Sequence, residues 1–169
     1  IDILVNNAGV SWGAPPDQMP VEKWRSVMDV NATGTFLMSQ AVGREMLRAH
    51  SGKIINQSST AAFMGNVGAV DTSDPDKPSP PFHYSVAKMG VNGLTKYFAG
   101  ALGPWGINVN AIAPGVTMTE ATKSVVPEEM LSMLVMFTAL KKALQPEDLT
   151  GTAVFLASPD SDMMTGQVL

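Results

Sequence analysis

Residues 1–9 read IDILVNNAG, a pattern typical of a short strand followed by a turn. The first five residues are mostly apolar strand formers, and Asn6, Asn7 and Gly9 end the run. Small and amide-bearing residues directly after a strand let a ligand approach the backbone closely and offer it both hydrogen-bond donors and acceptors. A plain turn is the competing interpretation of the same residues.

Short apolar strands alternate with helices along the rest of the chain. We predict strands over residues 53–56, 107–112 and 166–169, and helices over residues 21–49, 84–102, 127–140 and 146–157. This alternation is typical of βαβ units. We therefore expect one α/β domain with a doubly wound parallel sheet of the Rossmann-like kind and helices on both faces.

Both ends of the sequence fall on predicted strands, with no polar tail before Ile1 or after Leu169. A solitary outer strand as apolar as residues 1–5 would be an aggregation-prone edge. We therefore expect further βα units before Ile1, on the order of 80 residues if about three units of roughly 30 residues each are needed. Residues 1–169 would then be the carboxyl-terminal, catalytic part of a single domain that lacks its first cofactor-binding units and the end of its last strand.

Composition excludes several classes of function. The net charge of −4 and the pI near 5.0 give no basic field, so we expect no nucleic-acid partner. No apolar run approaches the roughly 18 residues of a membrane-spanning helix, so we expect no membrane partner. The chain has no cysteine. That excludes disulfides and thiolate metal sites, predicts no metal, and fits a reducing compartment, so we expect a cytoplasmic protein.

Tyr84 and Lys88 lie four residues apart on the helix predicted at 84–102, so their side chains share one face. A nearby ammonium group favours the phenolate and lowers the pKa of a tyrosine from about 10 toward the range of a general base. The spacing alone carries little weight, because it arises by chance in very roughly one chain in three of this length. The residues around the pair decide what it means.

Two loops that follow predicted strands bring further chemistry to the same edge of the sheet. Ser58 and Ser59 come just after the strand at 53–56, where open α/β sheets bind their ligands. A serine there can donate a hydrogen bond to a substrate oxygen. Pro114-Gly115 follows the strand at 107–112 in the same way. Both loops also have a plain interpretation as turns.

The helix predicted at residues 21–49 carries the amide of Asn31 on its apolar face. Trp24, Met28 and Asn31 fall at positions i, i+4 and i+7 of that helix. Asparagine is a mediocre helix former, and a buried amide without partners costs about 1–3 kcal/mol. Asn31 is therefore either a site residue or an ordinary buried amide.

Together these features occur in a fixed order: a strand with Asn-Asn-Ala-Gly, a helical Asn, a strand with Ser-Ser, Tyr-x-x-x-Lys on a helix, and a strand with Pro-Gly. The order resembles the short-chain dehydrogenase/reductase family, in its single-domain branch, over essentially the whole chain. Residues 2–9 (DILVNNAG) and 107–115 (INVNAIAPG) are both close to the family pattern. The resemblance implies NAD or NADP as the cofactor and hydride transfer between the nicotinamide and a secondary alcohol or ketone.

The resemblance also implies a role for each site residue. Tyr84 would exchange a proton with the substrate oxygen, and Ser59 would align that oxygen, so both would contact the substrate. Lys88 would bind the nicotinamide ribose and lower the pKa of Tyr84, and Asn31 would hold a water in a proton relay to Lys88. The cofactor would be bordered by Asn7, Ala8 and Gly9 on its adenosine side, by Pro114, Gly115, Thr117 and Thr119 beside the nicotinamide and pyrophosphate, and by Tyr84 and Lys88.

Parts of the family pattern would lie before Ile1, namely the Gly-rich phosphate loop and the residue that selects NAD or NADP. We therefore expect residues 1–169 alone to bind no dinucleotide detectably. Family members commonly form homotetramers or homodimers through two long helices. The same association is expected here, through residues 21–49 and 84–102.

Three alternatives stay open at this point. A sugar epimerase or dehydratase shares the Tyr/Lys pair but usually lacks Asn-Asn-Ala-Gly after the strand. An enoyl reductase is disfavoured, because such relatives space the tyrosine and the lysine more widely. A cofactor sensor or scaffold that kept the fold and lost catalysis would have no need of Ser59 together with Tyr84.

Two regions need an interpretation beyond the family motifs. Ser59 and Tyr84 are 25 positions apart, more than we expect for the family, and the excess is the polar, proline-rich segment 68–82. We favour a solvated surface insertion there over a rim above the substrate mouth. The Met-rich residues 130–140 would cover an apolar or variable substrate, or form ordinary core or subunit packing.

Overall fold

Three parallel strands form the centre of the chain, whose computed structural model describes residues 1–64, 81–126 and 128–169. They are β1 (Ile3–Asn6), β2 (Gly52–Gln57) and β3 (Ile107–Ile112), in the order β1-β2-β3. The register pairs Val5 with Ile55, and Ile55 with Asn110. Because the strands are parallel, the loops after all three leave the same edge of the sheet. The strands predicted at residues 1–5, 53–56 and 107–112 are confirmed to within two residues at each end.

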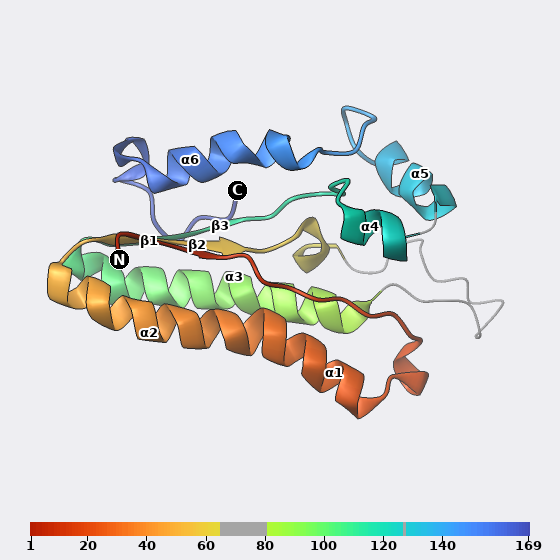
Figure 1. Cartoon of the computed structure of the whole chain (residues 1–169), viewed down its shortest axis with the longest axis horizontal. Helices are drawn as coiled ribbons and strands as arrows, with labels where there is room; N and C mark the ends of the chain where they lie inside the picture. The colour runs from red at the N-terminus through yellow and green to blue at the C-terminus, as the bar shows by residue number, and fades with distance from the viewer. Residues whose placement is uncertain (65–80, 127) are drawn as a thin grey trace.

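Helices cover both faces of this sheet (Figure 1). One face carries α1 (Val21–Met28), α2 (Gly34–Ala49) and α3 (Phe82–Leu102), and the other carries α6 (Thr150–Ala157). The centre strand shows why both layers form. Ile54 belongs to the core cluster under α2 and α3, and Ile55 belongs to the cluster under α6. Successive strand residues point to opposite faces, so β2 needs an apolar cover on each side. The predicted doubly wound architecture is confirmed.

The helix predicted at 21–49 is present but is not uniform. α1 and α2 are joined by a π-helical turn, η2 (Asp29–Thr33), which has Asn31 at its centre. His50 ends α2 in the left-handed conformation, with φ of 53°. The predicted helix 84–102 begins two residues early, at Phe82. Helix α3 therefore carries Tyr84 in its first turn.

Two short helices lie beyond the carboxyl edge of the sheet, α4 (Glu120–Val125) and α5 (Glu128–Met136) (Figure 1). Helix α4 differs from the prediction, which had no helix there, although Thr119 is a good N-cap and its hydroxyl accepts from the backbone N–H of Thr122 at 3.0 Å. The helix predicted at 127–140 ends earlier than expected, at Met136.

The last segment also follows the prediction, with shorter regular elements. The 3₁₀ turn η5 (Pro146–Leu149) leads into α6, and residues beyond it return to the sheet. Leu169 and Ala111 form a backbone hydrogen bond of 3.0 Å, and Ala113 donates to Leu169 at 2.7 Å. Val168 and Ala111 form an isolated parallel bridge, so the strand predicted at residues 166–169 is present only as this bridge. Other 3₁₀ turns are η1 (Pro16–Gln18), η3 (Thr60–Ala62), η4 (Gly103–Trp105) and η6 (Pro159–Ser161).

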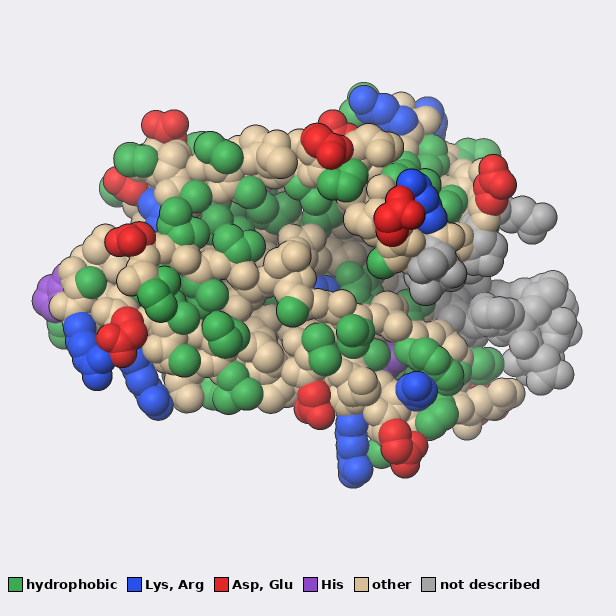
Figure 2. Space-filling model, viewed as in Figure 1, with side chains coloured by type: hydrophobic (Ala, Val, Ile, Leu, Met, Phe, Trp, Pro, Cys, Tyr) green, Lys and Arg blue, Asp and Glu red, His purple; other side chains and the backbone are tan. Residues whose placement is uncertain are grey.

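β1 forms one edge of the three-stranded sheet. Ile3 and Val5 on this strand are 45% and 53% exposed. Figure 2 shows hydrophobic side chains gathered over this side of the molecule. Over the described ranges, no helix combines the length and apolar character that crossing a membrane requires. Most of the loop predicted at 68–82 lies outside the described residues.

Candidate active site

Helix α3 carries two adjacent stripes of side chains, each spaced four residues apart. The first stripe is buried in the core and consists of His83, Ala87, Val91, Thr95 and Ala99. The second consists of Tyr84, Lys88 and Asn92, and it lies beside the loop that follows β2. Tyr84 is half-buried, while Lys88 is only 2% exposed. A buried amine is costly, so its position calls for partners.

The loop after β2 meets this second stripe at two serines. Ser58 is buried, and its hydroxyl donates to the Asn92 side-chain oxygen at 2.6 Å, which holds the strand end against α3. Ser59 caps the turn η3 by accepting from the backbone N–H of Ala61 at 3.1 Å. Its hydroxyl also forms a side-chain hydrogen bond with Tyr84. The structure therefore brings together Ser59 and Tyr84, as the sequence predicted, and gives Ser58 a packing role.

Lys88 lies beside Tyr84 but binds elsewhere. Its Nζ donates to the main-chain oxygen of Gln57 at 2.8 Å and lies 5.5 Å from the centroid of the Tyr84 ring. Burial lowers the pKa of Lys88 to about 8. Lys88 therefore loses its proton at a lower pH than an exposed lysine does.

The pKa of Tyr84 is raised, and burial is the largest cause, opposed by the hydrogen bond from Ser59. The expected lowering of this pKa by Lys88 is therefore wrong for the chain alone. Burial of the phenolate has the larger effect on this pKa, because the free energy of removing its charge from water exceeds the stabilisation that one neutral hydroxyl provides.

Asn31 is fully buried at the centre of the π-helical turn. Its Nδ2 donates to the main-chain oxygens of Val10 at 2.7 Å and Val27 at 2.9 Å. These two bonds fix the amide and tie the loop after β1 to the helix. Its Oδ1 is buried and has no hydrogen-bond partner in the described structure. An acceptor in this state needs a donor that the neighbouring side chains do not supply.

Adjacent residues in the loop after β1 differ in burial and in the contacts they make, and the sequence does not show this difference. Asn6 is buried and donates to Asn56 at 2.8 Å and to Ser39 at 3.0 Å, so it cross-links the sheet to α2. Asn7, Ala8 and Gly9 are exposed. A Cβ on Gly9 would lie 2.8 Å from the Asn31 Oδ1 and 3.5 Å from the Lys88 Nζ. Gly9 is therefore the point at which this loop meets both buried polar side chains.

The loop after β3 approaches the loop after β2 from the other side. The backbone N–H of Thr60 donates to the oxygen of Pro114 at 3.0 Å. A Cβ on Gly115 would meet nothing within 4 Å, so open space adjoins this residue. The Thr117 hydroxyl donates to the main-chain oxygen of Gly115 at 3.3 Å, and the Thr119 hydroxyl caps α4. The two loops thus meet at the carboxyl edge, which the sequence predicts.

The Met-rich region forms α5 and the turn after it. Met133 and Leu134 are half-buried. Met136, Phe137 and Leu140 are 64%, 71% and 77% exposed. The helix α5 lies beyond the carboxyl edge of the sheet (Figure 1), and the apolar side chains at its end are exposed.

The arrangement fits the nicotinamide end of a dinucleotide. Gly9 leaves close access to the backbone, Asn31 offers an unpaired acceptor, and Lys88 offers N–H donors suited to ribose hydroxyls. Within the described ranges, no group of three His, Asp or Glu side chains could hold a metal ion.

Sequence analysis missed a buried chain of amides and hydroxyls below this site. The Asn56 Nδ2 donates to the Thr95 hydroxyl at 2.9 Å, and Thr95 donates to the oxygen of Val91 at 2.8 Å. With Asn6 and Ser39, this chain links β1 and β2 to α2 and α3. A signal was present in the sequence, because Asn56 lies inside an apolar strand.

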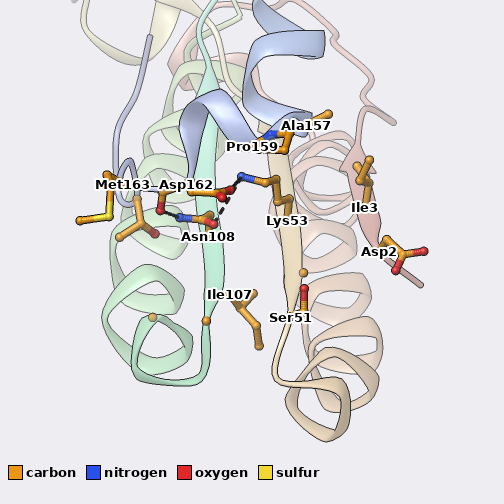
Figure 3. Close-up of a pocket in the computed structure, with 14 residues that line it drawn as sticks. Asp2, Ile3, Ser51, Lys53, Ile107, Asn108, Ala157, Pro159, Asp162 and Met163 are labelled. Atoms are coloured by element: carbon orange, nitrogen blue, oxygen red, sulfur yellow. Dashed lines mark hydrogen bonds and ion pairs between the residues drawn. The ribbon is translucent and has the colours of Figure 1, made fainter.

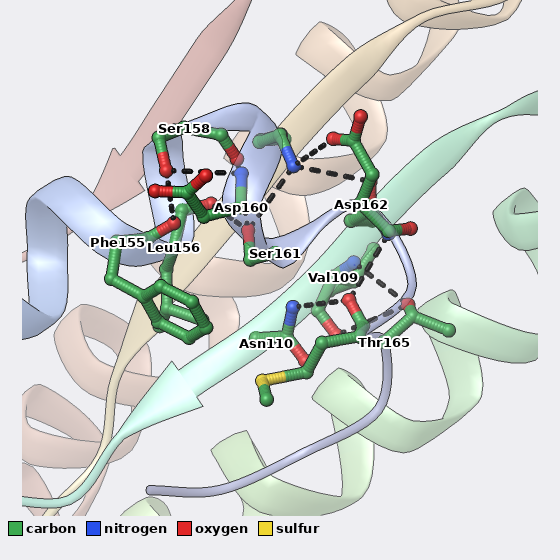
Figure 4. A network of polar contacts seen from close by, with 12 residues as sticks. Val109, Asn110, Phe155, Leu156, Ser158, Asp160, Ser161, Asp162 and Thr165 are labelled. Carbon is green, nitrogen blue, oxygen red and sulfur yellow. Dashed lines mark hydrogen bonds and ion pairs between the residues drawn. The ribbon is translucent and has the colours of Figure 1, made fainter.

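A separate cavity of about 660 Å³ lies at the opposite edge of the sheet, around the amino ends of β2 and β3. Figure 3 shows Lys53 there, reaching toward Asp162 at 2.8 Å and Asn108 at 3.5 Å. In Figure 4 these bonds continue into a network that ties η6 and the last segment to β3. Lys53 is fully engaged in that network. None of the predicted site residues lines this cavity.

Comparison with known proteins gives matches over the whole chain. A family model described as Enoyl-(Acyl carrier protein) reductase matches residues 1–169. A 3-oxoacyl-(acyl-carrier-protein) reductase from Synechocystis sp. is 41% identical over 99% of this chain and 62% of its own length.

Two solved structures are similar in fold. A 3-oxoacyl-(acyl-carrier protein) reductase from Brucella melitensis with bound NAD has a TM-score of 0.84 and 35% identity, over 99% of this chain and 59% of its own. A gluconate 5-dehydrogenase from Burkholderia cenocepacia, in complex with NADP and tartrate, has a TM-score of 0.88 and 35% identity, over 100% and 62%. The chain thus spans about three fifths of each of these relatives.

Proposed function

The chain belongs to the short-chain dehydrogenase/reductase family, and we propose that the protein carrying it is an oxidoreductase that transfers hydride between NAD(P) and a secondary alcohol or ketone. One observation carries the proposal: the Ser59 hydroxyl bonds the half-buried phenol of Tyr84 while the Lys88 amine lies 5.5 Å from the ring. A non-catalytic cofactor sensor has no use for this combination.

Tyr84 acts as the proton donor in ketone reduction. Because burial raises its pKa, the phenol keeps its proton at neutral pH. It gives that proton to the carbonyl oxygen as hydride reaches the carbonyl carbon, so the C=O bond becomes an alcohol. Ser59 holds the same oxygen by a second hydrogen bond.

Lys88 and Asn31 serve the return of the proton to Tyr84. A pKa of about 8 lets the Lys88 amine both hold and release a proton near neutral pH. A water bound to the unpaired Asn31 Oδ1 would lie close to that amine, because both atoms adjoin Gly9. Such a water would connect the amine to bulk solvent.

The nicotinamide cofactor supplies or accepts the hydride when bound. We assign its binding to Tyr84, Lys88 and two loops, through Asn7, Ala8, Gly9, Pro114, Gly115, Thr117 and Thr119. Of the similar structures above, one holds NAD and the other NADP, which supports NAD(P) without a choice between them.

The substrate class rests on the relatives and on the spacing of the pair. The named relatives act as reductases of 3-oxoacyl groups or as dehydrogenases of gluconate, both of which involve a ketone or secondary alcohol. The family model's description names enoyl reduction. Tyr84 and Lys88 are four residues apart, and this spacing favours carbonyl reduction over enoyl reduction.

Subunit association is part of the same proposal. Leu37 and Met38 on α2 are 52% and 49% exposed, and Met89 and Tyr97 on α3 are 61% and 73% exposed. Apolar side chains exposed on two long helices suit a homodimer or homotetramer. The cytoplasmic location expected from the cysteine-free sequence stays a prediction.

A substrate screen tests the proposed activity. The protein that carries this chain would be assayed with NADH and NADPH against 3-oxoacyl thioesters, keto-gluconates and simple ketones, with loss of reduced nicotinamide absorbance as the readout. We expect turnover of at least one ketone class and none of an enoyl thioester. Enoyl reduction without ketone reduction would contradict the proposal.

A further inference from the structure

The amino-terminal turn of α3 holds Tyr84, and no side chain among the described residues caps it. The N-cap residue is Pro81, which makes no side-chain hydrogen bond, and its main-chain oxygen accepts from Tyr84 and Ser85 at 3.0 and 3.3 Å. The ends of helices fray when nothing outside the helix holds them. A residue in a first turn needs such a contact if its position matters to within a fraction of an ångström.

An aromatic cluster of Trp24, Phe82 and His83 supplies this contact. The Trp24 ring lies 5.8 Å from Phe82 and 6.4 Å from His83, and the Phe82 and His83 rings are 5.6 Å apart. All three distances are within the range of favourable aromatic packing. Trp24 belongs to α1 and the other two to the first turn of α3, so the cluster joins two helices on one face of the sheet (Figure 1).

His83 is the unusual member of this cluster. It is fully buried, at the start of the core stripe that continues through Ala87 and Val91. Neither ring nitrogen has a hydrogen-bond partner in the described structure, and burial lowers the pKa of His83. The imidazole therefore acts here as a flat neutral ring rather than as a polar group.

Of the two helices joined by this cluster, α1 leads directly into the turn that holds Asn31, and α3 carries Tyr84. Trp24 lies two helical turns before Asn31, and His83 directly precedes Tyr84. Farther along the same interface, a Cβ on Gly90 would lie 4.0 Å from the Cβ of Ala32, so small side chains allow close contact there. The aromatic cluster sets the separation at the other end of the interface.

We propose that the aromatic cluster is a positioning element for catalysis, in which His83 fixes the first turn of α3 and thereby places the Tyr84 phenol against Ser59. This inference rests on the proposed role of Tyr84. His83 is fully buried in the core stripe of α3, so it acts through its neighbour Tyr84. Its ring shape, and not its nitrogens, carries the role.

Steady-state kinetics of His83→Ala and His83→Phe test this in the protein that carries the chain. His83→Ala should lower kcat by about tenfold to a hundredfold and change the KM for the cofactor by less than about twofold, because the misplaced group acts in the chemical step. His83→Phe should return kcat to within about threefold of the parent, because it keeps the ring. An unchanged kcat in His83→Ala, or no rescue by Phe, would overturn the proposal.

Three further variants make the result decisive. His50→Ala removes a similar histidine, 5.3 Å from Trp105, at the far end of α2, and should leave kcat unchanged. If His83→Ala fails to fold, Trp24→Leu must show the same loss of kcat, and an unaltered kcat refutes the role. Tyr84→Phe separates the two proposals. Turnover retained in Tyr84→Phe contradicts the proposed function, whereas loss there beside a fully active His83→Ala contradicts the cluster alone.

Discussion

Replacing Gly9 by alanine puts one methyl group at the most crowded point of the candidate site. The added Cβ would lie 2.8 Å from the Asn31 Oδ1, closer than real Cβ contacts allow, and 3.5 Å from the Lys88 Nζ. Something must therefore move. The loop at Gly9 and the amide of Asn31 are the two candidates.

The amide cannot yield cheaply. Asn31 is fully buried, and its Nδ2 holds the oxygens of Val10 and Val27 at 2.7 and 2.9 Å. Turning the side chain away strains two hydrogen bonds of about 1 kcal/mol each. Overpacking a tight site costs typically about 1–3 kcal/mol. We expect Gly9→Ala to lower the free energy of unfolding by about 2–3 kcal/mol.

Urea unfolding followed by circular dichroism measures this change, with Gly93→Ala as the matched control. A Cβ on Gly93 meets nothing within 4 Å, and the residue lies inside α3. Alanine there should raise the free energy of unfolding by up to about 1 kcal/mol. Opposite signs for the two variants support the geometry at Gly9. If Gly9→Ala unfolds within about 0.5 kcal/mol of the parent, the described contact with Asn31 is incorrect.

Three other perturbations follow from the structure. Lys88→Met removes an amine whose pKa burial lowers to about 8. Between pH 8 and 10 the unfolded parent binds more protons than the folded parent, so its free energy of unfolding should rise by up to about 3 kcal/mol relative to the variant as the pH increases. A difference between the two proteins that does not change with pH in urea titrations would contradict this. The gain levels off above this window, because the Lys88 amine of the unfolded chain, with an ordinary pKa of 10.5, then loses its proton as well. Thr95→Val leaves the buried Asn56 amide without its acceptor and should cost about 1–3 kcal/mol, whereas Thr95→Ser should cost little; equal losses would exclude the hydrogen bond as the cause. Met89→Glu places a charge on the exposed apolar side of α3 and should lower the molar mass measured by light scattering, and an unchanged mass would place the subunit interface elsewhere.

Local pattern was enough to predict the strands and the layers. The runs ending at Asn6, Gln57 and Ile112 are short, apolar and sharply bounded, so their positions follow from sequence alone. Ile54 and Ile55 lie next to each other, and both are buried. In a strand, that pair needs an apolar cover on both faces, and the predicted doubly wound sheet has such strands.

Features that depend on packing between distant residues could not be predicted. The sequence does not show that Asn6 is a buried cross-link while Asn7 is exposed, because both follow the same strand. The π-helical turn at Asn31 and the raised pKa of Tyr84 depend on how α3 and the loop at Val10 close over these groups. His83 was not singled out either, since a lone histidine beside a tyrosine gives no signal until Trp24 lies against it.

Tyr84→Phe, in the protein that carries this chain, tests most directly whether Tyr84 transfers the proton. The substitution removes one oxygen and keeps the ring, so the packing of α3 is preserved. We predict that turnover of the best ketone falls by about 10²- to 10⁴-fold while the dissociation constant for the cofactor, measured by calorimetry, changes by less than about twofold. Turnover retained at the parent rate, with the cofactor bound equally well, would contradict the account.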